Sequence, residues 1–412
     1  MNHTSHCRAC GAPLAQTFAD LGLSPVSNAF IKAEDAARGE MFYPLHAMVC
    51  ERCWLVQLSD VTRAETHFHD DYVYFSSFSS SWLEHARRYV AAMTERFSLD
   101  AGSHVVEIAS NDGYLLQYFV QASIPCLGIE PTANTAAAAR KIGVESRELF
   151  FGCDTAKQLA AEGRQADLLL GNNVLAHVPD INDFVGGMPL LLKPQGVITL
   201  EFPHLLRLME QNQFDTLYHE HYSYLSLTAL MPIFQRAGLR FFDVEHLSTH
   251  GGSLRVYACH QDSAHRDSGS VAACLSQERD AGLMDAKVYA AFNEKVRATK
   301  RALLEFLIAA KREGRSIAAY GAAAKGNTLL NYCGIGKDFI DYVVDKNPVK
   351  QGRLLPGSRI PVLAPDAVAR TKPDYLIVLP WNIKDEVIDQ MRFIREWGGK
   401  FVIHIPSVQV IG

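Results

Sequence analysis

The sequence predicts an α/β protein in which a small metal-binding unit precedes two doubly wound α/β units. Three observations predict this class. Two C-x-x-C pairs lie near the amino terminus, and short apolar strands alternate with helix-like segments from residue 104 onward. The same alternation begins again after residue 315. A rhythm of this kind is typical of a mainly parallel sheet with helices on both faces.

The length of the chain predicts several domains. With 412 residues it exceeds the size at which a single hydrophobic core keeps growing. Apolar residues make up 48% and charged residues 21%, which is typical of a chain that folds. We place the units at 1–65 (metal-binding), 66–255 (first α/β unit with a leading helical segment), 256–314 (helical linker) and 315–412 (second α/β unit).

Charge and hydropathy argue against two classes of partner. The formal net charge is -5 and no basic stripe is visible, so a nucleic-acid partner is not expected. No apolar run approaches the ~20 residues of a membrane-spanning helix, and the first residues lack the pattern of a signal peptide. We expect a cytoplasmic protein that is a monomer or a weak homodimer.

Four cysteines predict a structural zinc site. They form the pairs "CRAC" and "CERC", and four thiolates make a closed tetrahedral site with no position left for substrate. A redox role needs only one such pair and would leave the other unexplained. The predicted ligands are Cys7, Cys10, Cys50 and Cys53.

The first turn of the first α/β unit predicts a cofactor site, because ligands of open parallel sheets bind at the carboxyl ends of the strands. The turn, "VVEIASNDGYLL", carries Glu107, Asn111, Asp112 and Gly113. Asp112 is expected to cap the next helix and Gly113 to allow close backbone approach. The glycines of the dinucleotide fingerprint are missing. An acidic turn suits a ligand with a cation and an amine, such as S-adenosylmethionine (SAM).

Two later strand ends support the same cofactor. "GIEP" places Glu130 23 residues after Glu107, near the spacing of acids that bind ribose hydroxyls. "GNNVLAHVPD" places Asn172 near the methionine end of SAM, and His177 follows. In this order, the motifs predict a class I SAM-dependent methyltransferase (Rossmann-like) fold.

The ordered motifs resemble the three-domain, SAM-dependent C-methyltransferases that act on nucleotide-linked 4-keto deoxysugars. The resemblance implies that the metal is zinc, that the central domain binds SAM, and that the nucleotide-sugar lies between the central and carboxyl-terminal domains. It covers essentially the whole chain, through the two C-x-x-C pairs, "YVYFSS", "EIASNDG", "GIEP", "NNVLAHV", "FDTLYHEHYSYLS", "HGGSLR" and "YGAAAKGN".

The stretch "FDTLYHEHYSYLS" concentrates groups that transfer protons. Methylation of carbon requires removal of a C–H proton, which is acidic enough only beside a carbonyl, and histidine is the natural base near pH 7. If "YHEHY" is extended, His219 and His221 share one face, so spacing alone does not choose between them. A buried polar network or a metal-binding histidine pair is the alternative.

The resemblance does choose, and implies that His221 is the base. It also implies site roles for Tyr218, Glu220, Tyr72 and His177, the last two in hydrogen bonding sugar oxygens and stabilising enolate charge. Tyr74 is assigned to the substrate, since it shares a face with Tyr72 if their loop is extended. That aromatic and serine-rich loop, 70–81, is equally compatible with a buried hydrophobic wall. "HGGSLR" is either a glycine turn beside the ligand or a plain hairpin.

The second α/β unit contains a candidate anion site. In "AAYGAAAKGNTLL" a strand, Gly321 and a helix start precede Lys325 and Asn327, and helix amino termini attract anions such as a substrate diphosphate. Gly321 alternatively serves only close packing. The segment "DKNPVKQGRLLPG" adds Lys346, Lys350 and Arg353 as possible phosphate contacts.

These observations lead to one expected activity: methyl transfer from SAM to C3 of a nucleotide-linked 4-keto-6-deoxysugar through a base-generated enolate. The alternatives are a sugar O- or N-methyltransferase and a non-catalytic nucleotide-sugar binding protein. An NAD-dependent oxidoreductase is disfavoured because neither glycine turn has the dinucleotide fingerprint.

Overall fold

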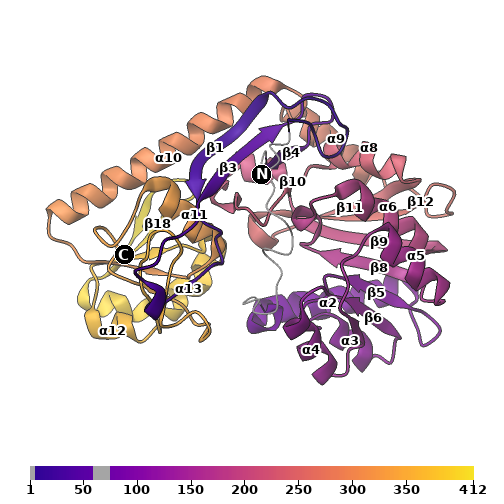
Figure 1. The fold of residues 1–412 in the computed structure, drawn as a ribbon, viewed down its shortest axis with the longest axis horizontal. Helices are drawn as coiled ribbons and strands as arrows, with labels where there is room; N and C mark the ends of the chain where they lie inside the picture. The colour runs from indigo at the N-terminus through magenta and orange to yellow at the C-terminus, as the bar shows by residue number, and fades with distance from the viewer. Residues whose placement is uncertain (1–4, 59–74) are drawn as a thin grey trace.

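The computed structural model describes residues 5–58 and 75–412. Two α/β lobes lie side by side, with the carboxyl-terminal unit on the left of Figure 1 and the central unit on the right. The long helix α10 (Ala286–Arg312) and the amino-terminal strands cross above both lobes. Predicted sites Tyr72 and Tyr74 lie outside the described residues.

The central unit is built on a seven-stranded sheet. Its first five strands in the chain are parallel, as the alternation of strands and helices predicts. Its last two strands form an antiparallel hairpin at one edge. The sheet continues through His260, past the predicted end of this unit at residue 255. In spatial order the strands are β11 (Leu239–Leu247), β12 (Ser253–His260), β9 (Leu192–Pro203), β8 (Ala166–Asn172), β5 (Val105–Ile108), β6 (Cys126–Ile129) and β7 (Ser146–Arg147).

Helices cover both faces of this sheet, because its strands are apolar on both sides. Two separate hydrophobic clusters result, one on each face. The helices are α2 (Ser80–Phe97), α3 (Leu116–Gln121), α4 (Ala133–Lys141), α5 (Cys153–Ala161), α6 (Ile181–Leu191), α7 (Leu205–Glu210), α8 (Leu227–Arg236) and α9 (Ser270–Asp280).

The carboxyl-terminal unit has a second, six-stranded sheet. Five strands run parallel and the last is antiparallel to its neighbour. In spatial order they are β16 (Val362–Leu363), β14 (Val343–Val344), β13 (Ile317–Tyr320), β17 (Tyr375–Val378), β18 (Lys400–Ile403) and β19 (Gln409–Ile411). The helices are α11 (Ala324–Cys333), α12 (Ala367–Thr371) and α13 (Lys384–Gln390).

The amino-terminal unit is joined to both lobes by backbone pairing and by packing. Its antiparallel sheet has the order β1 (Gln16–Ser24), β3 (Tyr43–Val49), β4 (Val56–Leu58) and β10 (Ser223–Tyr224), and β10 comes from the central unit. The short β2 (Ile31–Lys32) pairs with β15 (Arg353–Leu354) of the carboxyl-terminal unit. Phe18 of β1 stacks on Phe292 of α10, with ring centroids 4.5 Å apart. The three units therefore share interfaces at which composite sites can form.

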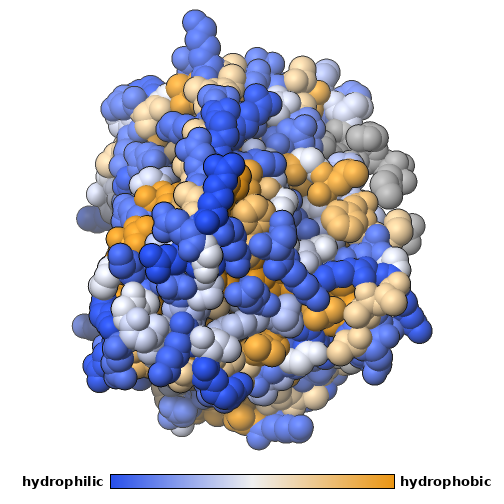
Figure 2. Space-filling view, turned by 90° about the vertical axis from the view of Figure 1, so that its left-hand side faces the viewer, coloured by the Kyte–Doolittle hydropathy of each residue, from blue (hydrophilic) through white to orange (hydrophobic). Residues whose placement is uncertain are grey.

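The outer face of the carboxyl-terminal lobe is mostly hydrophilic. Figure 2 shows this side with hydrophobic residues scattered among polar ones. Within residues 5–58 and 75–412, no helix has both the length and the apolar character needed to cross a membrane.

Candidate active site

A cavity of about 380 Å³ lies where the three units meet. Its walls include residues of the amino-terminal unit, of the carboxyl ends of the central strands, and of the start of α11. The predicted site residues that line it are Asn111, Glu130, Asn172, His177, Tyr218, Glu220, His221 and Lys325. The structure therefore brings together the predicted cofactor side and the predicted proton-transfer side.

The proton-handling stretch forms a turn. The backbone N–H of His221 donates to the carbonyl of Tyr218 over 2.8 Å, so the extended geometry considered from the sequence is wrong. The turn separates the two histidines. His219 hydrogen-bonds the carbonyl of Pro44 over 3.1 Å, against the amino-terminal unit, whereas His221 lines the cavity. Pairing of β10 with β4 anchors the chain immediately after this turn.

The hydrogen bonds of His221 define its tautomer. Its Nδ1 atom lies 3.0 Å from the carbonyl oxygen of Thr216, which can only accept, so Nδ1 carries the proton. Its Nε2 atom lies 2.8 Å from the hydroxyl of Tyr218 and accepts from it. Nε2 is therefore the basic nitrogen. Burial holds the pKa of His221 well below its usual value, so the ring is neutral at pH 7.

His177 lies against His221, with ring centroids 4.6 Å apart in an edge-on arrangement. It hydrogen-bonds the backbone of Glu220, and burial lowers its pKa to about 4. A neutral imidazole at this position can donate or accept a hydrogen bond without placing a cation beside the basic nitrogen of His221. The alternative of a metal-binding histidine pair is not supported, since His219 points away from the cavity.

Glu220 is a buried carboxyl group in the cavity wall. Only 3% of the residue is exposed, and burial raises its pKa to about 7, while a hydrogen bond from Asn28 and the charge of Lys350 oppose the rise. A carboxyl group with such a pKa exchanges a proton readily near neutral pH.

The first turn of the central unit, residues 109–113, is tightly folded. Ala109, Asn111 and Gly113 all have positive φ, and a Cβ on Gly113 would lie 3.1 Å from Ala139. This glycine thus serves close helix packing. Asp112 does not cap α3, whose N-cap is Leu115 without a side-chain bond, and that expectation was wrong. Instead, Asp112 accepts from the backbone of Ser77 over 3.1 Å.

Asn111 anchors the same preceding segment, since its Oδ1 accepts from the backbone of Ser76 over 2.9 Å. Glu107 is buried beneath the turn, and desolvation raises its pKa well above the usual range despite a hydrogen bond with Tyr114. Glu107, Asp112 and Gly113 are outside the cavity wall described above, whereas Asn111 is part of it. Of the four residues predicted in this turn, one therefore lines the cavity and three lie outside its wall.

Glu130 and Asn172 lie in the wall at the ends of β6 and β8. Glu130 accepts from the backbone N–H groups of Asn111 and Thr132, each over 2.9 Å, and through separate oxygens. A carboxylate has further acceptor capacity for ribose hydroxyls. Neither amide atom of Asn172 has a hydrogen-bond partner among residues 5–58 and 75–412, although both atoms are buried. An unsatisfied buried amide facing a cavity fits a polar ligand.

The carboxyl-terminal unit contributes two lysines to the cavity. Lys325 hydrogen-bonds Asn382 over 2.7 Å and lies 4.6 Å from the ring centre of Trp381. Lys350 donates to the carbonyl of Ala322 over 2.8 Å. Burial lowers the pKa of both ammonium groups. Gly321 has φ +92 where a Cβ would approach Pro380 to 2.5 Å, so the close-packing reading of this glycine is supported.

Two other predicted substrate residues do not reach the cavity wall. Asn327 is buried in α11, and its side-chain amide has no hydrogen-bond partner in the described part of the chain. Arg353 belongs to β15, which pairs with β2. Neither is among the residues that line the cavity.

Among the wall residues that the sequence did not predict are Asn28 and Trp82, while His250 and Lys350 were left as open possibilities. His250 is the first residue of "HGGSLR"; it lies in the connection between β11 and β12 and lines the cavity. Its ring packs edge-on against Trp82 with centroids 5.2 Å apart. The histidine beside two glycines was the signal for His250, while nothing local distinguishes Asn28.

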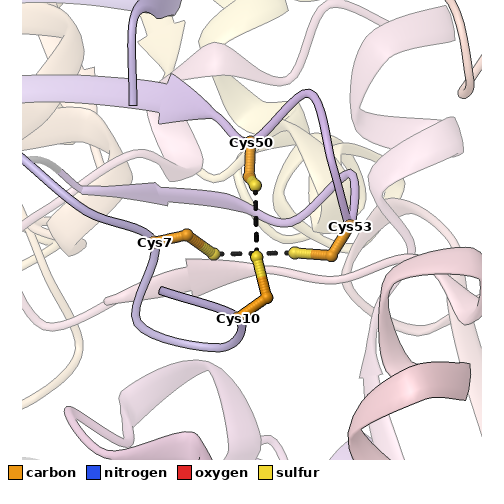
Figure 3. Close-up of side chains that lie close together, drawn as sticks. All are labelled: Cys7, Cys10, Cys50 and Cys53. Carbon is orange, nitrogen blue, oxygen red and sulfur yellow. Dashed lines mark hydrogen bonds between the residues drawn. The ribbon is translucent and has the colours of Figure 1, made fainter. Parts of the chain in front are cut away.

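The four predicted metal ligands come together at one point (Figure 3). Their sulfur atoms all lie within 4.8 Å of one another, and none of the four cysteines is in a disulfide. Zn–S bonds of about 2.3 Å in a tetrahedron place sulfur atoms about 3.8 Å apart. The measured Sγ–Sγ distances of 3.5 Å for Cys7 and Cys53 and 3.6 Å for Cys10 and Cys50 fit that geometry.

Comparison with known proteins shows which families the parts of the chain resemble. Three family descriptions match: a putative zinc binding domain over residues 7–68, a methyltransferase domain over 82–244, and a C-methyltransferase C-terminal domain over 248–406. The C-methyltransferase NovU of Streptomyces niveus is 38% identical over 408 residues, which cover 98% of this chain and 96% of NovU.

More distant likenesses cover less than half of the chain. A ubiquinone biosynthesis O-methyltransferase of Rhodopseudomonas palustris is 28% identical over 24% of this chain and 40% of its own. The magnesium protoporphyrin IX methyltransferase of Synechocystis with bound SAM shares 15% identity over 43% of this chain and 79% of its own, with a TM-score of 0.34. This last likeness is too remote to bear on activity.

The site and the fold define a SAM-dependent methyltransferase with a structural zinc site. The near full-length match to NovU is more specific, and the chain belongs to the family of three-domain C-methyltransferases. The family resemblance of the sequence is thereby confirmed. SAM supplies an electrophilic methyl group, and the accepting atom of the substrate is carbon.

Proposed function

We propose that the protein methylates C3 of a nucleotide-linked 4-keto-6-deoxysugar, and that His221 generates the enolate. The observation that carries this proposal is the neutral imidazole of His221, with Nε2 as its basic nitrogen, on the wall of the cavity that also contains Glu130 and Asn172. A base and a methyl donor that share one cavity are the two requirements for methylating an activated carbon.

The proposed reaction begins with transfer of the C3 proton to Nε2 of His221. The electron pair of the broken C–H bond moves into the C3–C4 bond, and the ketone oxygen becomes an enolate. Carbon C3 then attacks the methyl group, and the sulfonium leaves as the neutral thioether of S-adenosylhomocysteine. His221 afterwards releases its proton to solvent.

The neighbours of His221 have supporting roles in this proposal. The hydroxyl of Tyr218 orients Nε2 before the substrate arrives, and Thr216 fixes the tautomer. His177 and Tyr72 are proposed to hydrogen-bond sugar and enolate oxygens, which favours the charge that develops in the transition state. Glu220, whose pKa is about 7, is proposed to hold or release a proton in the cavity wall beside the turn.

The nucleotide-sugar is proposed to lie toward the carboxyl-terminal unit. Two lysines, Lys325 and Lys350, bring positive charge to that wall, and a diphosphate is the part of the substrate that would compensate it. Asn327 and Arg353 are not among the residues that line the cavity, so we propose that they act through their neighbours. Tyr74 remains a proposed substrate contact.

The proposal is tested by incubating the protein with SAM and a panel of nucleotide-linked 4-keto deoxysugars. Mass spectrometry of the product should show one added methyl group, and carbon NMR should place it on C3 with formation of S-adenosylhomocysteine. A methyl group on oxygen or nitrogen would replace C-methylation with the O- or N-methyltransferase alternative. Binding of every panel member without S-adenosylhomocysteine would favour the non-catalytic alternative.

A further inference from the structure

The amino-terminal unit supplies a side chain to the cavity next to the proton-handling turn. Asn28 lies between β1 and β2, and its Nδ2 atom donates to Oε1 of Glu220 over 2.7 Å. The two residues are 192 positions apart in the chain, and both line the cavity. This contact links the zinc-binding unit directly to a predicted catalytic group.

The backbone around Asn28 is held from both sides. The N–H of Phe30 donates to the carbonyl of Asn28 over 2.9 Å, which closes a tight turn. Immediately after it, β2 pairs with β15 of the carboxyl-terminal unit. Lys350, also in the cavity wall, lies 5.4 Å from the ring centre of Phe30. The amide therefore approaches Glu220 from a segment that the carboxyl-terminal unit keeps in place.

Glu220 needs such a partner because it is buried. Burial favours the neutral acid, whereas an N–H donor favours the carboxylate. Asn28 and Lys350 are the two groups that lower the pKa of Glu220 against desolvation, which leaves it at about 7. Other charged or titratable groups nearby include Asp345, 3.9 Å from the ammonium of Lys350, and His177, which hydrogen-bonds the backbone of Glu220. Tyr218, His221, His250 and Lys325 line the same cavity.

We propose that Asn28 is a positioning residue of the active site: its amide orients the Glu220 carboxyl group in the cavity wall and favours the ionised form. The zinc-binding unit then completes the active site, in addition to its own structural role. The inference deepens the proposed function, but the contact and its effect on protonation exist in the absence of substrate.

The test removes the donor and follows the protonation of Glu220 without any substrate. The carboxyl stretching band of Glu220 is assigned by infrared difference spectroscopy as the band that Glu220→Gln removes. Its pH midpoint in the unaltered protein should be near 7. In Asn28→Ala we expect that midpoint to rise by about one pH unit, which is a tenfold lower ratio of carboxylate to acid.

Asn182→Ala is the matched control. Asn182 is also an amide that joins the two units, since its Nδ2 donates to the carbonyls of Arg8 and Ala9 over 3.0 and 3.1 Å, but it is not among the residues that line the cavity. This variant should leave the midpoint of Glu220 unchanged. Equal midpoints in Asn28→Ala and the unaltered protein would overturn the proposal, as would an equal rise in Asn182→Ala.

A second readout uses turnover once a substrate is accepted. The limb of the kcat/KM profile that reports Glu220 should move to higher pH in Asn28→Ala, whichever form of the carboxyl group is active. In a Glu220→Gln background, Asn28→Ala should no longer move the profile. A uniform loss of rate at every pH would contradict the proposal. Failure of the sugar reaction itself would leave the infrared result intact, so the two proposals fail separately.

Discussion

The hydroxyl oxygen of Tyr218 lies 2.8 Å from Nε2 of His221, and the two rings are 4.0 Å apart between centroids. The backbone turn from Tyr218 to His221 holds the two side chains on the same side. Since the carbonyl of Thr216 accepts a hydrogen bond from the protonated Nδ1, the tyrosine hydroxyl donates to the basic nitrogen Nε2 until a substrate replaces it. The pair thus orients the base before the reaction.

Replacing Tyr218 should slow turnover without abolishing binding. In Tyr218→Phe we expect kcat to fall by about 10- to 100-fold, because an imidazole that has lost one of its two orienting hydrogen bonds samples unproductive orientations. KM should change little. Tyr43→Phe is the control, since the Tyr43 ring contacts His219, on the side away from the cavity. Steady-state kinetics check this, and an unchanged kcat in Tyr218→Phe would remove the orienting role.

The zinc site predicts a metal content and a stability effect. The purified protein should contain about one zinc per chain, and Cys10→Ser should lose most of it because one of four thiolates is missing. The variant should also melt at a markedly lower temperature, since structural zinc contributes on the order of 10 kcal/mol. Cys259→Ser, a buried cysteine of β12 outside the cluster, should retain its zinc. Equal zinc in both variants by elemental analysis would contradict the assignment.

Asn172 should contribute to cofactor affinity. Its buried amide has no hydrogen-bond partner within the described ranges. A ligand that forms one or two hydrogen bonds with this amide should therefore bind more tightly. Asn172→Ala is expected to weaken binding of S-adenosylhomocysteine by about 10- to 100-fold in calorimetric titration. Asn182→Ala, outside the cavity wall, should bind normally. Undiminished affinity in Asn172→Ala would place the cofactor elsewhere.

Glu220 should make the protein less stable at high pH. Its pKa is about 7 in the folded state and near 4.3 when unfolded, so the folded state binds the extra proton between those values and loses stability as pH rises through them. Glu220→Gln should therefore raise the free energy of unfolding at pH 8, by at most about 4 kcal/mol, and the gain should vanish toward pH 4.5.

Glu201 provides the opposite case. Although burial opposes ionisation, contacts with His85 and Arg255 lower the pKa of Glu201 overall. Its stabilising effect is present above the unfolded pKa and lost as pH falls, so Glu201→Gln should be destabilising at pH 8. Thermal melts of both variants at pH 5 and pH 8 check the signs. A lower melting temperature for Glu220→Gln at pH 8 would contradict the buried-acid account.

Much of the fold could be predicted because its signals are local. Short apolar runs that end in Glu130 and Asn172 mark parallel strands, and these ends meet at one edge of the sheet. The two C-x-x-C pairs are likewise a local signal, and they predict the cluster of four cysteines. The polar corner at residues 110–113 is likewise a turn, as its composition indicates.

The wrong predictions concern side chains that could contact either a residue nearby in the sequence or one that is distant in the sequence. Asp112 was expected to cap its own helix but bonds Ser77, and Arg353 was placed on a phosphate-binding loop but lies in a strand paired with β2. The contribution of Asn28 depends on the contact between two units that the sequence does not specify. His219 and His221 were separable only through family resemblance, because the turn between them is set by tertiary contacts.

The central claim is that His221 removes a proton from carbon, and hydrogen exchange tests it most directly. An accepted 4-keto sugar is incubated in heavy water with S-adenosylhomocysteine in place of SAM, and deuterium at C3 is followed by NMR. The unaltered protein and His219→Gln should exchange this proton, since His219 faces Pro44. His221→Gln, the same change two residues away, should not. Exchange and methylation that persist in His221→Gln would contradict the account.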